Sequence, residues 1–164
     1  RQLLPLMQPG CRIVNTVSCT YAIGRIEPDF FEKGKNGRFY SIPVYGNTKL
    51  ALLLFTQELA KRIQDKGITI NASDPGIVST NMITMQAWFD PLTDILFRPF
   101  IKTPAQGAAT AIHLALSDEA KDRNGCCYAN CKKKNMSERI RHHAQQKQLW
   151  DDTEILLRQK GIRF

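Results

Sequence analysis

The sequence has 164 residues, 43% of them hydrophobic and 23% charged, and its formal net charge at pH 7 is +8. This length and composition fit one domain with one hydrophobic core, and they exclude collagen, coiled-coil and wholly disordered chains. No apolar stretch approaches the roughly 18 to 20 residues of a membrane span, and the N-terminus lacks a signal-peptide pattern, so we expect a soluble protein.

The first half of the chain predicts a strand, a loop, a helix and a second strand. Residues 11–18 form a short, β-branched, apolar run that is typical of a strand covered on both faces. Residues 20–43 are rich in Gly, Pro and charge and indicate a long surface loop. From Tyr45 to near Gly67, apolar residues recur at three- and four-residue steps, which predicts an amphipathic helix.

The second half continues the alternation. Residues 67–73 predict a strand that ends at the Asp-Pro-Gly turn of 74–76, and residues 126–130 predict a third strand. Between them, residues 102–116 predict a helix with a capping box, and residues 137–160 predict a C-terminal helix. Strands that alternate with helices are normally parallel, with right-handed crossovers, so the fold class is α/β.

The predicted helix from Tyr45 carries a Tyr-x-x-x-Lys pair, Tyr45 and Lys49. Residues four apart share a helix face, so the two side chains are neighbours. A free phenol has a pKa of about 10, and a nearby ammonium group favours its phenolate form, which suits proton transfer near neutral pH. Tyr128 and Lys132 have the same spacing, but they straddle the end of a predicted strand, where positions four apart do not stack.

A third polar group is expected near this pair. Ser18 lies at the end of the first predicted strand, and the 74–76 turn follows the next one. Open α/β sheets bind their ligands at the carboxyl ends of the strands, so both features should face one site.

Four ordered blocks of this sequence resemble the short-chain dehydrogenase/reductase family, and most of all its retinol-dehydrogenase-like branch. They are RIVNTVS at 12–18, YGNTKLALLLFTQELAKRI at 45–63, INASDPGIVST at 70–80 and FIKTPAQGAATAIHLAL at 100–116. The resemblance implies a partial Rossmann-type doubly wound parallel sheet, made of the last three strands with their flanking helices. It implies one domain over 1–164, the C-terminal catalytic and substrate-binding half of an oxidoreductase.

The resemblance also implies a role for each matching residue in an NAD- or NADP-dependent interconversion of an alcohol and a carbonyl. Tyr45 would be the general acid/base, Lys49 would favour phenolate and bind the nicotinamide ribose, and Ser18 would hydrogen-bond the substrate oxygen. The resemblance also matches four residues to the turn that binds the nicotinamide in the family: Pro75, Gly76, Ile77 and Thr80. Asp74 departs from the family, in which His, Ala or Asn is commoner at this position.

The segment 81–101 is rich in Met, Trp and Phe. In the family this region is the substrate-binding lid, which implies a small apolar alcohol or carbonyl substrate. Ordinary packing and a peripheral membrane contact are the alternatives. The candidate lining residues are Met82, Met85, Trp88 and Phe89.

A glycine-rich turn for the cofactor pyrophosphate is missing from this sequence. The isolated chain should therefore bind nicotinamide cofactors very weakly and be inactive, and its first strand should have an unpaired edge. A catalytically inactive fragment or a binding module stays open as the alternative function. A homodimer is possible, because family members commonly associate through the tyrosine helix.

The cysteines and basic residues indicate no further site. Five dispersed cysteines without a C-x-x-C pair favour free thiols in a reducing compartment such as the cytoplasm, and no metal site is expected. The basic run at 132–143 lacks interleaved aromatic residues, so it predicts a solvated face and no nucleic-acid partner.

Overall fold

The computed structural model describes residues 2–28, 30–31, 42–78 and 101–162. Within these ranges a four-stranded sheet has the order β1-β2-β3-β4. Strands β1 (Arg12–Thr16), β2 (Thr69–Asp74) and β3 (Cys127–Ala129) are parallel, as the sequence predicts. The register pairs Thr16 with Ser73, so the carboxyl ends of β1 and β2 lie side by side.

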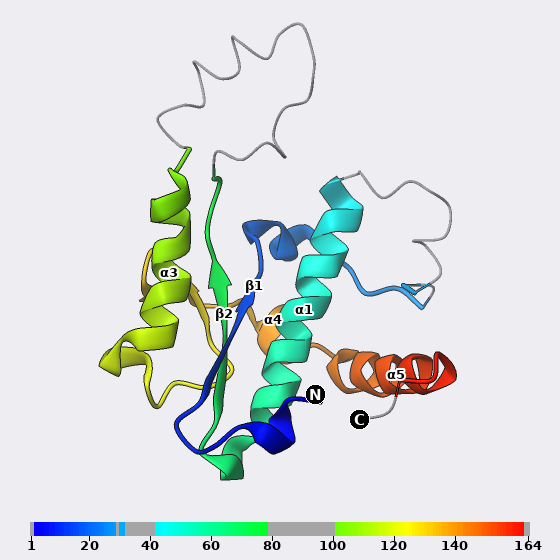
Figure 1. The fold of residues 1–164 in the computed structure, drawn as a ribbon. Helices are drawn as coiled ribbons and strands as arrows, with labels where there is room; N and C mark the ends of the chain where they lie inside the picture. The colour runs from blue at the N-terminus through cyan, green and yellow to red at the C-terminus, as the bar shows by residue number, and fades with distance from the viewer. Residues whose placement is uncertain (1, 29, 32–41, 79–100, 163–164) are drawn as a thin grey trace, which may run out of the picture.

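Two long helices cover the sheet from opposite sides (Figure 1). One is α1 (Ile42–Arg62), which begins three residues before the predicted start. The other is α3 (Pro104–Leu116), whose N-terminus has the predicted capping box: Thr103 Oγ1 accepts from Gln106 N–H, and the Gln106 side chain accepts from Thr103 N–H. Both parallel crossovers are confirmed by the pairing of the strands.

Short 3-10 helices occupy several connections. They are η1 (Leu4–Leu6), η2 (Cys19–Ile23), η4 (Gln64–Lys66) and η6 (Asp118–Ala120). The loop predicted from residue 20 thus begins as helical turns in η2, and α1 passes through η4 before Gly67 turns the chain in the left-handed region at φ 64°.

The prediction of three strands misses β4 (Lys132–Lys133), which pairs antiparallel with β3. Asn130 and Cys131 join the two strands, with φ of 52° and 59°. Positive φ at both central residues defines a type I′ hairpin turn, for which Asn-Gly is the usual signal. Cys131 stands where this turn signal has Gly, so the sequence pattern does not predict the hairpin.

The prediction of one continuous C-terminal helix over 137–160 is wrong. The chain forms α4 (Glu138–Arg141) and α5 (Gln146–Gln159), with a break at 142–145. The break lets Ile140 pack in the core with Leu54, while Trp150 packs in a second cluster with Leu59. A single straight helix would not bring both apolar groups onto α1.

Helix α1 supplies the centre of the core. Leu50, Leu53 and Leu54 are fully buried, as the helical periodicity predicts. Two polar residues of this helix, Gln57 and Glu58, are nevertheless only 8% exposed. Helix α5 covers Glu58, whose Oε2 accepts from Gln146 Nε2 at 3.1 Å and whose Oε1 accepts from Arg62 Nε at 2.8 Å. Gln57 Nε2 lies 3.6 Å from Met136 Sδ.

Strand β1 stands at one end of the sheet and pairs only with β2 in the described part of the chain. Its residues 12–15 are half-buried.

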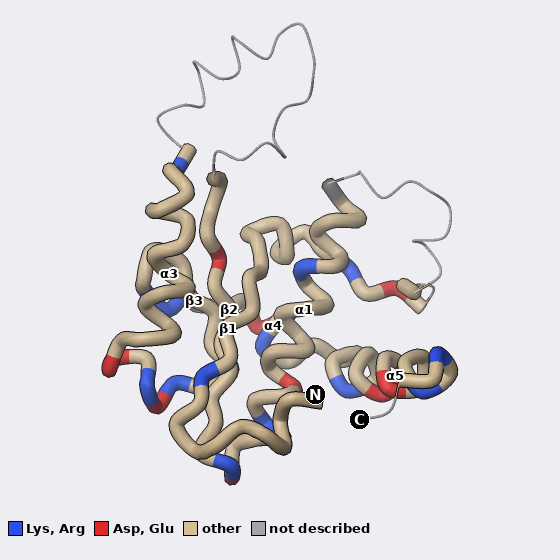
Figure 2. The backbone as a smooth tube through the Cα atoms, in the orientation of Figure 1, with Lys and Arg blue, Asp and Glu red and all other residues tan. Residues whose placement is uncertain are grey.

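The charged residues are distributed over several elements. Figure 2 shows basic segments on α1, on α5 and on the connection that follows α3, with acidic segments among those of α5. In the basic run at 132–143, Lys132 and Lys133 are exposed. Arg139 is exposed as well, although it donates to the carbonyl oxygens of Ala22 and Gly24. The prediction of a solvated face fails for Lys134, which is half-buried and forms an ion pair with buried Asp74.

All five cysteines are unpaired thiols, as predicted. Among the helices that the structure describes, none combines the length and the hydropathy needed to cross a bilayer.

Candidate functional site

Ser18 lies where β1 has just ended. The backbone N–H of Val17 donates to Ser73 O at 2.9 Å, which is the last link between the two strands. Ser18 has an extended backbone and caps η2, with its Oγ accepting from Thr20 N–H at 3.4 Å. The Ser18 side chain is half-buried, so its hydroxyl stays at the carboxyl end of the sheet.

Helix α1 approaches the segment after Ser18 very closely, and two glycines permit this. A Cβ on Gly46 would lie 2.8 Å from the carbonyl oxygen of Thr20, and a Cβ on Gly24 would lie 2.4 Å from that of Gly46. Any side chain at these positions would push α1 away from η2. The glycine directly after Tyr45 therefore fixes how near the tyrosine helix comes to the serine.

Lys49 connects the tyrosine to the end of β1. Its Nζ donates to Thr16 O at 3.1 Å and lies 5.3 Å from the centroid of the Tyr45 ring. Tyr45 is 37% exposed. Among the described residues, no hydrogen bond joins the Tyr45 hydroxyl to Ser18 or Lys49. The structure thus brings the lysine to the tyrosine and to the serine strand.

The Asp-Pro-Gly turn follows β2 at the same end of the sheet. Gly76 has φ of +78°, which favours glycine over residues with a Cβ. Pro75 and Gly76 are half-buried, and Ile77 is 51% exposed. An apolar side chain of this size thus stands uncovered beside the turn.

The rest of the predicted site lies outside the described residues. This applies to Thr80 of the proposed cofactor turn and to the predicted lid residues Met82, Met85, Trp88 and Phe89. Their roles stay predictions.

Sequence reasoning missed the residues that hold the turn. Asp74 is 2% exposed and forms an ion pair with Lys134, with 3.0 Å between Oδ2 and Nζ. Lys102 Nζ donates to Pro75 O at 2.8 Å. The departure at Asp74 was visible in the sequence, but no local pattern links it to a lysine 60 residues later.

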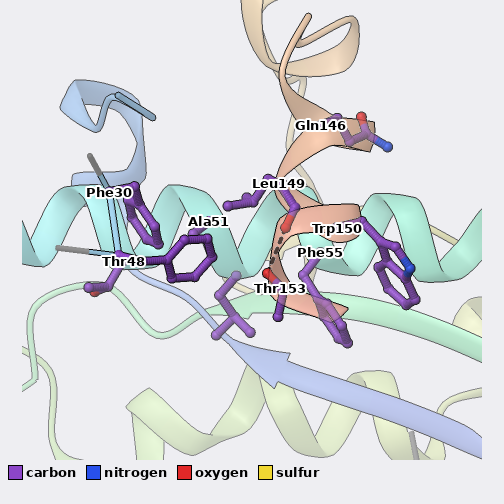
Figure 3. A pocket seen from close by; sticks show the side chains of 10 residues that line it. Phe30, Thr48, Ala51, Phe55, Gln146, Leu149, Trp150 and Thr153 are labelled. Carbon is purple, nitrogen blue, oxygen red and sulfur yellow. Dashed lines mark hydrogen bonds between the residues drawn. The ribbon is translucent and has the colours of Figure 1, made fainter. Parts of the chain in front are cut away.

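A cavity of about 270 Å³ lies away from this arrangement, between α1, α5 and the segment at 30–31. Figure 3 shows Phe30, Phe55 and Trp150 around it, and a hydrogen bond from Thr153 Oγ1 to Leu149 O in its α5 wall. Ser18, Tyr45 and Lys49 are not among its lining residues. The cavity therefore does not coincide with the site that the sequence predicts.

The sequence profile of the short chain dehydrogenase family matches residues 32–88. Retinol dehydrogenase 12 of Mus musculus is 39% identical over 140 residues, which are 85% of this chain and 43% of that relative. The chain belongs to the short-chain dehydrogenase/reductase family. Its relatives among the retinol dehydrogenases place it in the retinol-dehydrogenase-like branch. The chain spans less than half the length of these relatives.

Solved structures agree with this short-chain dehydrogenase fold. A protein of Mycobacterium paratuberculosis has a TM-score of 0.65 and 22% identity, over 94% of this chain and 52% of that one. A short chain dehydrogenase of Burkholderia cenocepacia, crystallised in complex with NADP, has a TM-score of 0.55 and 23% identity, over 75% of this chain and 45% of that one. Both support the predicted fold class, a partial Rossmann-type sheet.

Proposed function

We propose that this chain carries the catalytic and substrate-binding half of an NAD- or NADP-dependent oxidoreductase that interconverts an alcohol and a carbonyl compound. The observation that carries the proposal is the position of the Lys49 ammonium, between the carboxyl end of the serine strand and the Tyr45 ring. Membership of the short-chain dehydrogenase/reductase family supports the same chemistry.

The described residues fit the nicotinamide end of such a cofactor. Ile77 offers an exposed apolar surface beside the Pro75–Gly76 turn, at the sheet edge where α/β folds bind ligands. Lys49 would bind the ribose hydroxyls, because its ammonium group has donors to spare after the bond to Thr16 O. A nicotinamide held there would supply the hydride acceptor for oxidation of the alcohol and the hydride donor for reduction of the carbonyl compound.

Tyr45 would be the general acid/base of the reaction. In the direction of oxidation, the Tyr45 phenolate oxygen takes the hydroxyl proton of the alcohol as the hydride leaves its carbon. In the direction of reduction, the Tyr45 hydroxyl returns this proton to the carbonyl oxygen. Ser18 Oγ donates a hydrogen bond to the same substrate oxygen, and the Lys49 charge stabilises the phenolate.

The substrate that we propose is a small apolar alcohol or aldehyde. Mouse retinol dehydrogenase 12 is named for an apolar alcohol, and the segment 81–101 of this chain is rich in Met, Trp and Phe. The sequence contains no glycine-rich turn for the cofactor pyrophosphate, so the 164-residue chain by itself should bind the cofactor weakly and turn over little substrate.

The test compares Tyr45→Phe with the unchanged enzyme in the longest polypeptide that its gene encodes. NADPH oxidation is measured with retinaldehyde and with shorter apolar aldehydes, and NADPH affinity is measured by calorimetry. We expect at least a hundredfold loss of kcat with little change in affinity, because general acid–base groups typically contribute about 10² to 10⁴ in rate. Undiminished turnover in Tyr45→Phe would refute the assignment.

A further inference from the structure

The carboxylate of Asp74 is buried at the point where β2 ends, and both of its oxygens are engaged. Oδ1 accepts from the backbone N–H of Gly76 at 3.0 Å, and Oδ2 lies 3.0 Å from Lys134 Nζ. The Asp74 side chain is only 3% exposed. A carboxylate at this depth is costly unless it is paired and hydrogen-bonded, so these two contacts offset the cost of burying it.

Lys134 directly follows β4, and its side chain forms the ion pair with Asp74. Its backbone N–H donates to Cys127 O at 2.8 Å, and its ammonium lies 5.0 Å from the centroid of the buried Tyr21 ring. Burial alone would lower the pKa of Lys134, but the hydrogen bond to Asp74 and the charge of that carboxylate outweigh burial and raise the pKa. Lys134 therefore stays charged at physiological pH.

Lys102 holds the other side of the turn. Its Nζ donates to Pro75 O at 2.8 Å and to Asn130 Oδ1 at 2.6 Å, and its backbone N–H donates to Ile77 O at 2.9 Å. A Cβ on Gly76 would meet Lys102 Nζ at 3.1 Å. The Pro75–Gly76 peptide group is thus held at both of its polar atoms: its carbonyl oxygen accepts from Lys102 Nζ, and its N–H donates to the Asp74 carboxylate.

We propose that Asp74, Lys134 and Lys102 are positioning residues that hold the Pro75–Gly76 turn in the shape that receives the nicotinamide end of the cofactor. This inference rests on the proposed function. Groups held by packing and by secondary hydrogen bonds bind a ligand without having to be ordered first, so their loss weakens binding more than it changes the chemistry.

The first experiment examines the turn in this chain, without cofactor. Amide hydrogen exchange of Gly76 is measured by NMR in the unchanged chain and in Asp74→Ala, Asp74→Asn and Lys134→Met. We expect at least tenfold faster exchange in Asp74→Ala, and a change below threefold in Asp74→Asn, which keeps an acceptor oxygen. Lys134→Met should accelerate exchange severalfold.

Lys133→Met is the matched control, because Lys133 is the exposed neighbour on β4 and should leave Gly76 unchanged. Equal Gly76 exchange in Asp74→Ala and the unchanged chain would overturn the inference. If Asp74→Ala does not fold, the Gly76 exchange rate of Lys134→Met is compared with that of the unchanged chain instead, and equal rates would overturn the inference.

The second experiment measures the NADPH dissociation constant and the steady-state constants in the longest polypeptide that the gene encodes. In Lys134→Met, we expect the dissociation constant for NADPH to rise at least tenfold and the KM for NADPH to rise with it, while kcat falls less than threefold. In Lys134→Arg, most of the NADPH affinity should return. Unchanged NADPH affinity in Lys134→Met overturns this inference even where Tyr45→Phe has abolished turnover. An absence of NADPH binding in every form would instead refute the proposed function, whatever the Gly76 amide shows.

Discussion

The ammonium nitrogen of Lys49 lies 5.3 Å from the centroid of the Tyr45 ring and donates a hydrogen bond to the carbonyl oxygen of Thr16. One lysine thus spans the tyrosine helix and the end of the serine strand. Its charge therefore lies beside the Tyr45 ring and at the carboxyl end of the serine strand at the same time.

Replacing Lys49 with Met should impair both cofactor binding and proton transfer, because the variant keeps the apolar stem and loses the charge. In the longest polypeptide that the gene encodes, we expect a higher KM for NADPH and a fall of at least a hundredfold in kcat. Steady-state kinetics measures both constants, and an unchanged kcat in Lys49→Met would contradict the role given to Lys49.

Gly46→Ala should destabilise the chain, although it lies within a helix. Helix propensity alone favours Ala over Gly by about 1 kcal/mol. Here the new Cβ would lie 2.8 Å from the Thr20 carbonyl oxygen, and a backbone atom cannot move aside cheaply. Urea unfolding of the 164-residue chain measures the change in the free energy of unfolding. A variant more stable than the unchanged chain would show that η2 can move away from α1 without loss of stability.

Trp150→Ala should remove the main contact between α5 and α1. The Trp150 ring stacks on Phe55, with centroids 5.0 Å apart and planes 12° apart, and the Arg62 guanidinium lies 4.5 Å from it. Truncation of a buried Trp typically costs about 3 to 5 kcal/mol in the free energy of unfolding. Ile155→Ala is the control on the same helix, because Ile155 is 55% exposed, and it should change stability by less than about 1 kcal/mol.

Cys131→Gly should stabilise the β3–β4 hairpin. Cys131 adopts φ of 59°, which costs an L-residue about 1 kcal/mol and costs glycine little. The change also creates the Asn-Gly pair that type I′ turns favour. We expect a gain of up to about 1 kcal/mol in urea unfolding. Cys19→Gly, at an exposed position with no left-handed backbone, should give no such gain.

Stability should fall in alkaline solution, in part through Cys127. Burial raises the pKa of this thiol to about 11, from an ordinary value of 9.0. Between these two pH values the unfolded chain releases the thiol proton and the folded chain keeps it, so rising pH favours unfolding. A difference of about two pKa units corresponds to about 3 kcal/mol.

The measurement is urea unfolding from pH 8 to 11 in the unchanged chain and in Cys127→Ala. The variant should be less stable at pH 8, because the thiol fills core space, and its stability should decline less steeply with pH. Cys19→Ala is the exposed control and should follow the unchanged chain. Parallel pH curves for all three proteins would show that Cys127 does not cause the decline.

The elements that position the candidate site were predictable from local patterns. The β-branched runs at 11–18 and 67–73 form strands at 12–16 and 69–74, and the apolar period of α1 and the capping box at Thr103 form as expected, because each of these patterns acts within a few residues. The left-handed φ at Asn130 and Cys131 could not be predicted, because Cys is no usual turn residue and the side chains that contact this turn, Lys102 and Thr110, come from other segments.

By itself, the sequence determined the order of strands and helices and the Tyr-x-x-x-Lys pair on one helix face, because hydrophobic period and helix geometry are local properties. Only the tertiary structure decided which polar groups are buried and how they are paired. Glu58 meets Gln146 across 88 residues, and Asp74 meets Lys134 across 60. Such pairs depend on the path of the whole chain. A buried charge must find a partner, because burying it alone is costly, and no short stretch of sequence specifies which residues become buried.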